Sequence, residues 1–436
     1  MQTNFTAEAL LEPQTRESEK ILRSCVHCGF CTATCPTYLL LGDELDSPRG
    51  RIYLIKDMLE GGKPANAEIV KHIDRCLSCL SCMTTCPSGV NYMHLVDHAR
   101  AYIEDTYRRP FADCFLRAVL AHVLPYRQRF RAALALARLA RPFTPLVRAV
   151  PGVGHRLAAM LALAPTGEPA RTTEAEQRVA APAKRVILLE GCAQPVLAPD
   201  INAATRRLLA RHNVEVVAAP GEGCCGALVH HMGREDEALA FARRNIDAWC
   251  RVIDAGRVDA IVITASGCGT TIKDYGFLFR EDAAYREKAA RIAALTRDVT
   301  EFLLDLDLAP SRTTGQTIAY HSACSMQHGQ KIGDQPKTLL RKVGFTVRDV
   351  PEGHICCGSA GVYNILQPEL SERLLDRKLK NVERTRPALI ATGNIGCITQ
   401  LRRKATVPVV HTAELLDWAC GGPTPAPLAG MPISDA

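Results

Sequence analysis

The sequence predicts an α+β protein of several domains, in which a helical N-terminal part precedes two α/β repeats. Eight cysteines lie in two short runs before residue 108, and the chain after residue 184 contains one cysteine pattern twice. The 436 residues suffice for roughly two to four domains. We expect a cysteine-rich helical domain at 15–107, a basic helical connector and linker at 108–184, α/β domains at 185–305 and 314–420, and a disordered tail at 421–436.

The composition excludes several classes of protein. Apolar residues make up 47% and charged residues 23% of the chain, an ordinary balance for a globular protein. The aromatic share of 5% argues against stacking platforms, so no nucleic acid partner is expected. No apolar stretch is long enough to span a membrane, and residues 1–14 lack the features of a secretory signal. We therefore expect a cytoplasmic protein whose nineteen cysteines bind metal rather than form disulfides.

Two cysteine runs of identical spacing dominate the N-terminal part. The pattern C-x2-C-x2-C-x3-C-P occurs at residues 25–36 and again at residues 76–87. Three cysteines at two-residue gaps can wrap three corners of a cubane cluster, and backbone N–H groups of that turn stabilise its negative charge. The fourth cysteine lies too far along the chain to bind the same cluster, so it ligates the other one. The spacing therefore predicts two [4Fe-4S] clusters, one held by Cys25, Cys28, Cys31 and Cys86 and the other by Cys76, Cys79, Cys82 and Cys35.

The same region predicts helices. Zinc ribbons also use C-x2-C pairs, but they do not repeat a four-cysteine run that ends in proline. Between the runs, Ser47-Pro48 is typical of a helix start, Ile52 to Leu59 form an amphipathic helix, and Gly61-Gly62 end it. A second helix is expected from His94 to Tyr107. The first domain is therefore expected to be an α-helical ferredoxin domain with two [4Fe-4S] sites.

The C-terminal part contains an internal repeat with a Cys-Cys-Gly turn in each copy. The cysteines of the first copy are Cys192, Cys224, Cys225 and Cys268, and those of the second are Cys324, Cys356, Cys357 and Cys397. The offsets between the copies are 132, 132, 132 and 129 residues. Strands are expected at 186–189, 214–217 and 260–264, and at 317–320, 345–350 and 388–391. Because they alternate with helices, we expect parallel sheets with the cysteines at their carboxyl edges.

The chemistry of the repeat cysteines stays open. Each set of four could hold an iron–sulfur cluster or a zinc ion, or one set could hold a cluster while the other is structural. We expect at least one further iron–sulfur cluster, with zinc as the main alternative and simple packing as the least favoured. Four histidines lie near these motifs, and we expect them in hydrogen-bonded structural roles: His321, His328, His354 and His411.

One segment carries most of the positive charge. From Arg108 to Thr166 there are ten arginines, no lysine and a single acidic residue, Asp113, while the whole chain has a formal net charge of +7. Leu116 and Leu120 belong to an apolar stripe at helical spacing. The segment could be a solvated connector, or it could contact anionic lipids or an acidic partner subunit.

Taken together, the cysteine runs and repeats resemble the family of iron–sulfur subunits of glycolate oxidase (glycolate dehydrogenase), the F-type subunits of D/E/F complexes. The resemblance covers about residues 15–420 and is carried by CVHCGFCTATCPTYLLLGDELDSPRGRIYLIK, DRCLSCLSCMTTCPSGV, LEGCAQPVLAPDINAATRRLL, NIDAW, TASGCG and CCGSAG. The wider superfamily includes subunits of anaerobic glycerol-3-phosphate dehydrogenase, lactate-utilisation proteins and heterodisulfide reductase.

The resemblance implies that this chain is the electron-transfer subunit of an oxidoreductase. The chain itself would have no catalytic residue. FAD and the glycolate site would lie on D- and E-type partner subunits, and this chain would relay electrons towards the quinone pool. It would be peripheral on the cytoplasmic face of the inner membrane, with membrane contact through residues 108–166. The sequence agrees that no flavin is bound here, because no G-x-G-x-x-G follows a predicted strand.

Alternative functions follow from the same superfamily. The chain could serve a related lactate or glycerol-3-phosphate dehydrogenase, or it could be a catalytic subunit like heterodisulfide reductase. Each repeat ends in one cysteine, Cys268 or Cys397, where the heterodisulfide reductase group has C-x-x-C. In addition, Ala323 precedes Cys324 where many relatives have proline. The single terminal cysteines disfavour disulfide reduction and favour a relay.

Overall fold

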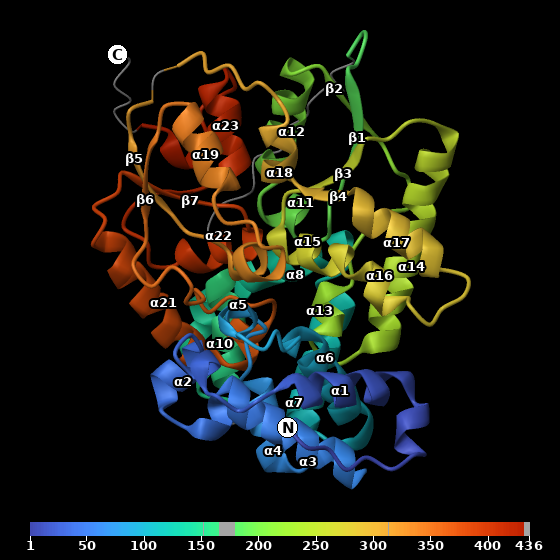
Figure 1. Ribbon diagram of the computed structural model, residues 1–436. Coiled ribbons are helices and arrows are strands. Elements are labelled where there is room, and N and C mark those ends of the chain that lie inside the picture. The colour runs from blue at the N-terminus through green and yellow to red at the C-terminus, as the bar shows by residue number, and fades with distance from the viewer. Residues whose placement is uncertain (151, 165–178, 313, 431–436) are drawn as a thin grey trace.

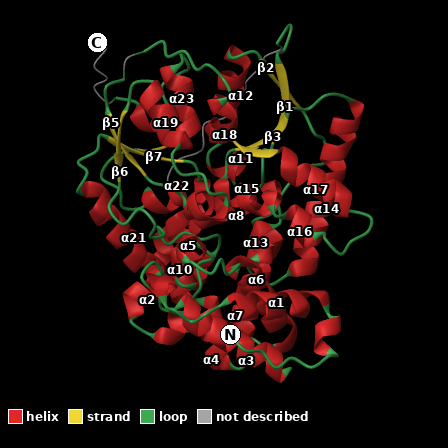
Figure 2. Ribbon diagram, viewed as in Figure 1, coloured by secondary structure: helices red, strands yellow, loops and turns green. Residues whose placement is uncertain are grey.

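The computed structural model describes residues 1–150, 152–164, 179–312 and 314–430. A helical N-terminal domain forms one end of the molecule, and two small sheets form the other end (Figure 1). Helices make up most of the fold, as Figure 2 shows, and among the described residues none is long and apolar enough to cross a membrane. The α+β multidomain class predicted from the sequence is confirmed.

The N-terminal domain is built from short helices around a small apolar core. They are α1 Pro13–Ser24, α2 Pro36–Leu41, α3 Pro48–Gly61, α4 Ala67–Asp74, α5 Ser81–Thr85 and α6 Tyr92–Thr106, with 3-10 turns at Ala9–Leu11, Phe30–Thr32 and Glu44–Asp46. Ser47 caps α3 by accepting a hydrogen bond from the backbone N of Gly50, and Gly62 ends it with positive φ. Leu22, Ile55 and Leu95 are fully buried between α1, α3 and α6. Both helices expected in this region are therefore present.

Between this domain and the repeats, the described residues form four α-helices and one 3-10 turn. They are α7 Phe111–Val123, α8 Arg127–Ala140, the 3-10 turn Arg141–Phe143, α9 Thr144–Arg148 and α10 Gly154–Leu163. Leu116 and Leu120 of α7 are buried in a cluster that contains Val229 of the first repeat and Ile365 of the second. The apolar stripe of α7 therefore faces the protein interior. The expected linker after Ala164 lies at 165–178, outside the described residues.

Each repeat contains a four-stranded parallel sheet. The orders are β2-β1-β3-β4 and β6-β5-β7-β8. The strands are β1 Lys184–Leu188, β2 Val214–Val217, β3 Ala260–Ile263, β4 Thr296–Asp298, β5 Thr317–Tyr320, β6 Thr346–Asp349, β7 Leu389–Thr392 and β8 Val409–His411. The six expected strands and their parallel pairing are confirmed. The fourth strand of each sheet was not predicted, because three residues are too few to show a periodicity.

The helices repeat in the same order in both copies. The first repeat has α11 Gln194–Leu197, α12 Asp200–Arg211, α13 Ala227–His230, α14 Glu235–Ala255, α15 Ser266–Lys273, α16 Tyr275–Leu278, α17 Arg286–Leu295 and α18 Val299–Leu304. The second has a π-helical turn at Ser325–Gly329, then α19 Gln335–Lys342, α20 Tyr363–Leu366, α21 Pro368–Glu383, α22 Ile395–Leu401 and α23 Thr412–Ala419. The second repeat lacks counterparts of α16 and α17 among the described residues.

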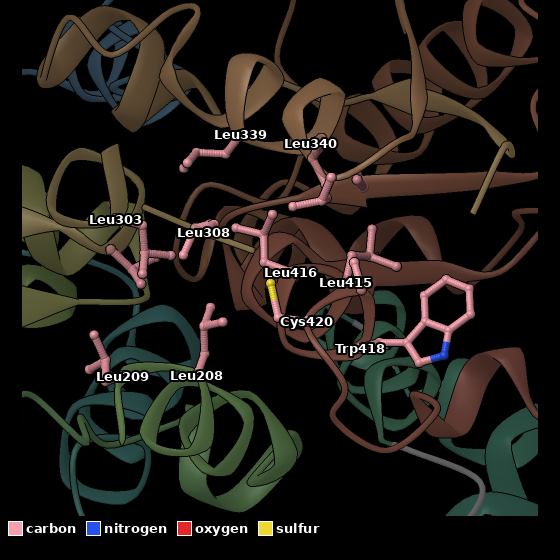
Figure 3. Close-up of a cluster of buried hydrophobic side chains, with 14 of the residues drawn as sticks. Leu208, Leu209, Leu303, Leu308, Leu339, Leu340, Leu415, Leu416, Trp418 and Cys420 are labelled. Carbon is pink, nitrogen blue, oxygen red and sulfur yellow. The ribbon is translucent and has the colours of Figure 1, made fainter. Parts of the chain in front are cut away.

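The two repeats share one apolar core. Helix α12 packs on α23, and α18 packs on α19, so equivalent helices of the two copies exchange partners across the interface. Figure 3 shows leucines of all four helices meeting there, including Leu208, Leu303, Leu339 and Leu416. Because each repeat buries the apolar face of the other, the two copies form one folded unit.

The tail after residue 420 differs from the expected disorder over residues 421–430. Ala426–Leu428 forms a 3-10 turn, and Leu428 is 1% exposed in the core between the repeats. Arg312 donates from Nη1 to the backbone O of Gly422 at 2.9 Å. The proline-rich composition predicted disorder, but the single apolar residue Leu428 packs into the core and holds the segment in place. The remaining part of the expected tail, residues 431–436, lies outside the described residues.

We predict that Leu428→Ala lowers the stability of the repeats by about 2 to 5 kcal/mol, because it leaves a cavity in their shared core. Thermal unfolding of the full chain, followed by circular dichroism, measures the change as a lower midpoint. Thr424→Ala removes an exposed side chain of the same segment and serves as the control. Equal midpoints for the two variants would show that the segment contributes no packing energy.

Candidate metal centres

The first group of cysteines surrounds a small, partly open cavity in the N-terminal domain. The cysteines that line it are Cys25, Cys28, Cys31, Cys82 and Cys86. Burial, together with the nearby thiols of Cys25 and Cys86, raises the pKa of Cys31 to about 11. The fourth cysteine of the second run thus lies beside the first three cysteines of the first run. This is the arrangement that the spacing predicts, although ligand binding by these residues stays a prediction.

The second group surrounds another small cavity in the same domain. The cysteines that line it are Cys35, Cys76, Cys79 and Cys82. Burial and the neighbouring thiols of Cys356 and Cys35 raise the pKa of Cys79 well above its usual value. Cys82 borders both cavities, so the two groups are immediate neighbours. Because the pKa values of Cys79 and Cys82 are raised well above the usual value, metal binding by these two thiols would release protons.

The backbone of both runs has the conformation that an anionic cluster requires. In the first run, His27 and Gly29 have positive φ values of 56° and 83°. In the second run, Ser78 and Leu80 occupy the same two positions with φ values of 48° and 62°. Alternation of right- and left-handed residues points successive N–H groups into one concavity. Residues other than glycine rarely adopt positive φ values unless the surrounding structure imposes them. The positive φ values in both loops are therefore consistent with a backbone shaped to hold a cluster.

Polar groups surround the second cavity. Arg51, which is 1% exposed, donates from Nη1 to the Sγ of Cys35 at 3.8 Å and from Nη2 to the Oγ1 of Thr37 at 3.0 Å. Tyr92 donates from its hydroxyl to the Sγ of Cys76 at 3.7 Å. Burial opposes the charge of Arg51, but Cys76, Cys35 and other anionic neighbours raise its pKa, so it stays protonated. Donors of this kind stabilise thiolates and the added electron of a reduced cluster.

The first repeat brings its four cysteines together in an apolar environment. Cys225 and Cys268 belong to the apolar core beneath the first sheet. The hydroxyl of Tyr275 donates to the backbone O of Cys225 at 2.8 Å. Cys192 and Cys224 are in contact, and the contact with Cys224 and burial raise the pKa of Cys192 well above its usual value. Although that contact favours the thiolate of Cys224, Cys225 and burial raise its pKa to about 12.

The second repeat gathers its cysteines in a different electrostatic environment. Hydrogen bonding from Cys357 outweighs burial and, with His321, lowers the pKa of Cys397 to about 5. Contacts with Cys324 and Cys357 lower the pKa of Cys356 well below its usual value. One ring nitrogen of His321 and the sulfurs of Cys357 and Cys397 all lie within 4.8 Å of one another. The pKa values of Cys324 and Cys357 are raised, so the second set combines two cysteines that favour the thiolate with two that favour the thiol.

Two residues beside the second set of cysteines differ from those at the corresponding positions of the first repeat. His321 directly follows β5, where Leu189 directly follows β1. Gly226 packs on the backbone of Ala238, and Gly358 packs in the same way on Ser371. Seven residues beyond these contacts, α14 carries Asn245 and α21 carries Lys378. The second repeat thus has a histidine and a buried cation where the first has a leucine and an amide.

Lys378 and His321 are unusual for buried polar side chains. The Nζ of Lys378, which is 1% exposed, donates to the backbone O of Glu352 at 3.1 Å and lies close enough to Cys324 to interact with its charge. Burial lowers the pKa of Lys378, while the nearby cysteine thiolates oppose that shift. Both ring nitrogens of His321 are buried without a hydrogen-bond partner. The structural role expected for His321 stays a prediction, whereas His411 caps α23 and bonds the backbone O of Thr264 at 2.9 Å.

The second cysteine run packs directly against the second repeat. Leu77 and Cys79 share an apolar cluster with Cys324 and Cys356. The hydroxyl of Tyr363, also in that cluster, donates to the backbone O of Arg75 at 3.1 Å. The cavities of the N-terminal domain and the cysteines of the second repeat therefore form one continuous series.

Comparison with known proteins agrees with this organisation. The family model of the 4Fe-4S dicluster domain matches residues 21–90, and that of the cysteine-rich domain matches residues 186–273 and 318–402. The glycolate oxidase iron-sulfur subunit of Escherichia coli K12 is 44% identical over 421 residues, which cover 96% of this chain and 99% of that protein. The chain belongs to the family of glycolate oxidase iron–sulfur subunits.

Other members and relatives give the same picture. The probable glycolate oxidase iron-sulfur subunit of Bacillus subtilis 168 is 31% identical, over 95% of this chain and 97% of that protein. Lactate utilization protein A of Bacillus licheniformis is 28% identical and covers 53% of this chain and 99% of that protein. As a glycolate oxidase iron–sulfur subunit, the chain is an oxidoreductase subunit that carries iron–sulfur clusters.

Sequence patterns in this glycolate oxidase subunit did not reveal the residues that surround the sulfurs. Arg51 and Tyr92 lie in ordinary helical segments, and Lys378 occupies one buried position of an amphipathic helix. The spacing of Cys25–Cys86 shows where a cluster fits, but hydrogen bonds to sulfur come from residues that are distant in sequence. A comparison of the two repeats offers one usable signal, because the second repeat has Lys378 at the position where the first has Asn245.

We predict that Tyr92→Phe lowers the reduction potential of the cluster in the second cavity and leaves that of the first unchanged. Loss of one hydrogen bond to Cys76 removes about 0.5 to 1.5 kcal/mol of stabilisation, or about 20 to 65 mV for one electron. Potentiometric titration followed by electron paramagnetic resonance measures both potentials. Tyr102→Phe is the control, because its hydroxyl donates to the backbone O of Lys63 and touches no cysteine. Equal shifts in both variants would contradict the assignment.

Proposed function

We propose that this chain relays electrons from a flavin on partner subunits of a glycolate oxidase to the quinone pool. The observation that carries the proposal is the continuous series of thiol sites from the surface of the N-terminal domain to the second repeat. An iron–sulfur cluster in each site would supply one-electron transfer. Glycolate as the substrate of the complex rests on the family to which the chain belongs.

The first cavity is the place where electrons would enter. Cys28 is exposed beside this cavity. Val26, Phe30 and Tyr53 around it expose 67%, 62% and 59% of their surface. A flavoprotein that covered these apolar side chains would exclude water from the first cavity and approach it closely. Cys82 borders both cavities, and Cys79 borders the second repeat. Electrons that enter at the first cavity would therefore pass to the second cavity and then to the second repeat.

The second repeat is the proposed third site of the relay. Its cysteines adjoin Cys79, and His321 and Lys378 supply an additional ligand and a compensating charge. The first repeat lacks both groups, and the pKa values of Cys192, Cys224 and Cys225 are raised. We therefore assign a further iron–sulfur cluster to Cys324, Cys356, Cys357 and Cys397, because zinc in its place could not carry electrons. The cysteines of the first repeat then have a structural role.

We predict that Cys79→Ser separates the two half-reactions of the reconstituted complex. Glycolate-dependent reduction of quinone should fall at least tenfold, because the variant interrupts the series between the second cavity and the second repeat. Reduction of a soluble dye that takes electrons directly from the flavin should stay within twofold of wild type. Steady-state assays with the two acceptors measure both rates.

Cys114→Ser is the matched control for this experiment. Cys114 is exposed on α7 and belongs to neither cavity. Its replacement should leave both rates unchanged. Normal quinone reduction by Cys79→Ser would rule out the relay through this site, and parallel loss of both activities would place the chain in glycolate oxidation itself.

Only part of the basic segment 108–166 is available for contact with a membrane. Arg109 and Arg117 form ion pairs with Asp74 and Asp113 at 2.7 to 3.4 Å, so they serve the fold. Exposed apolar side chains are concentrated between residues 136 and 150, at the end of α8 and through α9: Leu136, Leu139, Phe143, Leu146 and Val150. Among the described residues, Arg131, Arg141 and Arg148 form no ion pair, and residues 114–164 contain no acidic residue.

We therefore propose that residues 131–150 contact an anionic membrane surface. In this surface, apolar side chains can enter the lipid interface while arginines meet the headgroups. Such a contact would hold the end of the relay near the quinone pool. This assignment is narrower than contact through the whole of 108–166, because Leu116 and Leu120 of α7 face the protein interior; Phe111 and Phe115, at the start of α7, are exposed outside it.

The double variant Leu139→Ser/Phe143→Ser should weaken binding to phosphatidylglycerol vesicles at least tenfold. Each side chain contributes roughly 1.5 to 3 kcal/mol when its apolar surface leaves water. Co-sedimentation of the full chain with anionic and with phosphatidylcholine vesicles measures the effect. Leu11→Ser removes a similarly exposed leucine from the N-terminal domain and should bind like wild type. Undiminished binding of the double variant would refute the proposed surface.

A further inference from the structure

A third cluster of metal-binding side chains lies away from every cysteine site. Asp97 projects from α6 of the N-terminal domain, and His230 and His231 end α13 of the first repeat. One ligand atom from each of the three residues lies within 4.8 Å of the other two. The elements meet where the N-terminal domain contacts the first repeat (Figure 1). The cluster therefore spans the joint between two domains.

The distances within this cluster do not fit hydrogen bonds. The Nδ1 of His230 lies 3.8 Å from Oδ2 of Asp97, and the Nδ1 of His231 lies 3.7 Å from Oδ1. Hydrogen bonds between nitrogen and oxygen are shorter, at about 2.7 to 3.2 Å. Zinc binds nitrogen and oxygen at about 2.0 to 2.2 Å, so two ligand atoms of a tetrahedral site lie about 3.4 Å apart. The two histidine–carboxylate separations exceed this value by a few tenths of an ångström and end on different oxygens of Asp97, so the side chains would have to move closer together around a shared ion.

Two of these ligand atoms are buried without a partner. Oδ1 of Asp97 and Nδ1 of His231 have no hydrogen-bond partner, and the residue Asp97 is 9% exposed. Buried polar atoms are nearly always bonded, so such a pair of facing atoms indicates a missing third participant. A cation between the three side chains would satisfy both unpaired atoms.

Backbone packing fixes the gap between the domains. Gly233, two residues after His231, has a φ of 85°, and a Cβ at this position would lie 2.3 Å from the backbone O of Arg100. The turn after α13 thus touches α6 directly and cannot move closer. Arg100 itself donates to the Oγ of Ser78 at 2.6 Å and to the backbone O of Cys76 at 2.7 Å. Its guanidinium is held by the second cysteine run and stays 3.8 Å from Asp97.

We propose that Asp97, His230 and His231 bind one divalent transition-metal ion of the zinc class, which ties the N-terminal domain to the first repeat. Two imidazoles and one carboxylate form a ligand set suited to zinc, and water can complete a tetrahedral site. The site contains no thiol and does not take part in the proposed relay. It is therefore independent of what the repeat cysteines bind.

The zinc content of the full chain, purified anaerobically without chelator, tests this site. His231→Asn should lose one zinc per chain, with iron and acid-labile sulfide unchanged. His231 is partly exposed, so the variant should fold. His155→Asn removes an exposed histidine of α10 and should keep the zinc. Cys268→Ser should also keep it, which separates this site from any zinc on the first repeat.

Cobalt provides a second measurement on the same proteins. Cobalt(II) added in place of zinc should give ligand-field bands without the intense thiolate charge-transfer band, and His231→Asn should abolish these bands. Wild-type protein that takes up neither zinc nor cobalt would overturn the proposal. Retention of the full zinc content by His231→Asn, or loss of the zinc in Cys268→Ser, would also overturn it.

Discussion

A buried ion pair between Arg51 and Asp46 fixes the two cysteine runs relative to each other. Arg51 and Asp46 are 1% and 0% exposed, and Nη2 of Arg51 lies 3.2 Å from Oδ1 of Asp46. Asp46 also pairs with Arg75 at 2.7 Å, immediately before Cys76. Through its remaining donors, Arg51 reaches Thr37 and the Sγ of Cys35. Removal of one member of such a buried pair typically costs about 3 to 5 kcal/mol, so the geometry of both cavities depends on it.

The two repeats show how one fold supports two different environments. Both place a Cys-Cys-Gly turn after the second strand, and both need its glycine because the backbone of the following helix lies against it. Their shared core leaves the sheets equivalent. The divergence lies in side chains: His321 and Lys378 make the second set polar, while Leu189 and Asn245 leave the first set neutral. The polar set is also the one that adjoins the N-terminal cavities.

Local signals in the sequence sufficed for the elements that have strong patterns. The proline after each cysteine run, the cap at Ser47 and the repeat offsets predict the helices, the grouping of cysteines and six of the eight strands. Short strands such as Val409–His411 carry too few residues for a pattern. The order in which the sites adjoin one another could not be predicted from the sequence, because it depends on contacts between distant residues such as Leu77 and Cys356. For the same reason, no motif indicated that Leu428 anchors the C-terminal segment.

The most direct test of the relay is the iron and acid-labile sulfide content of two matched variants of the full chain. If the second repeat is the third site, wild-type protein holds about twelve irons per chain, and Cys397→Ser loses about four of them. Cys268→Ser, at the corresponding position of the first repeat, should then match wild type. About eight irons in all three proteins would confine the clusters to the N-terminal domain and contradict the proposed extension of the relay.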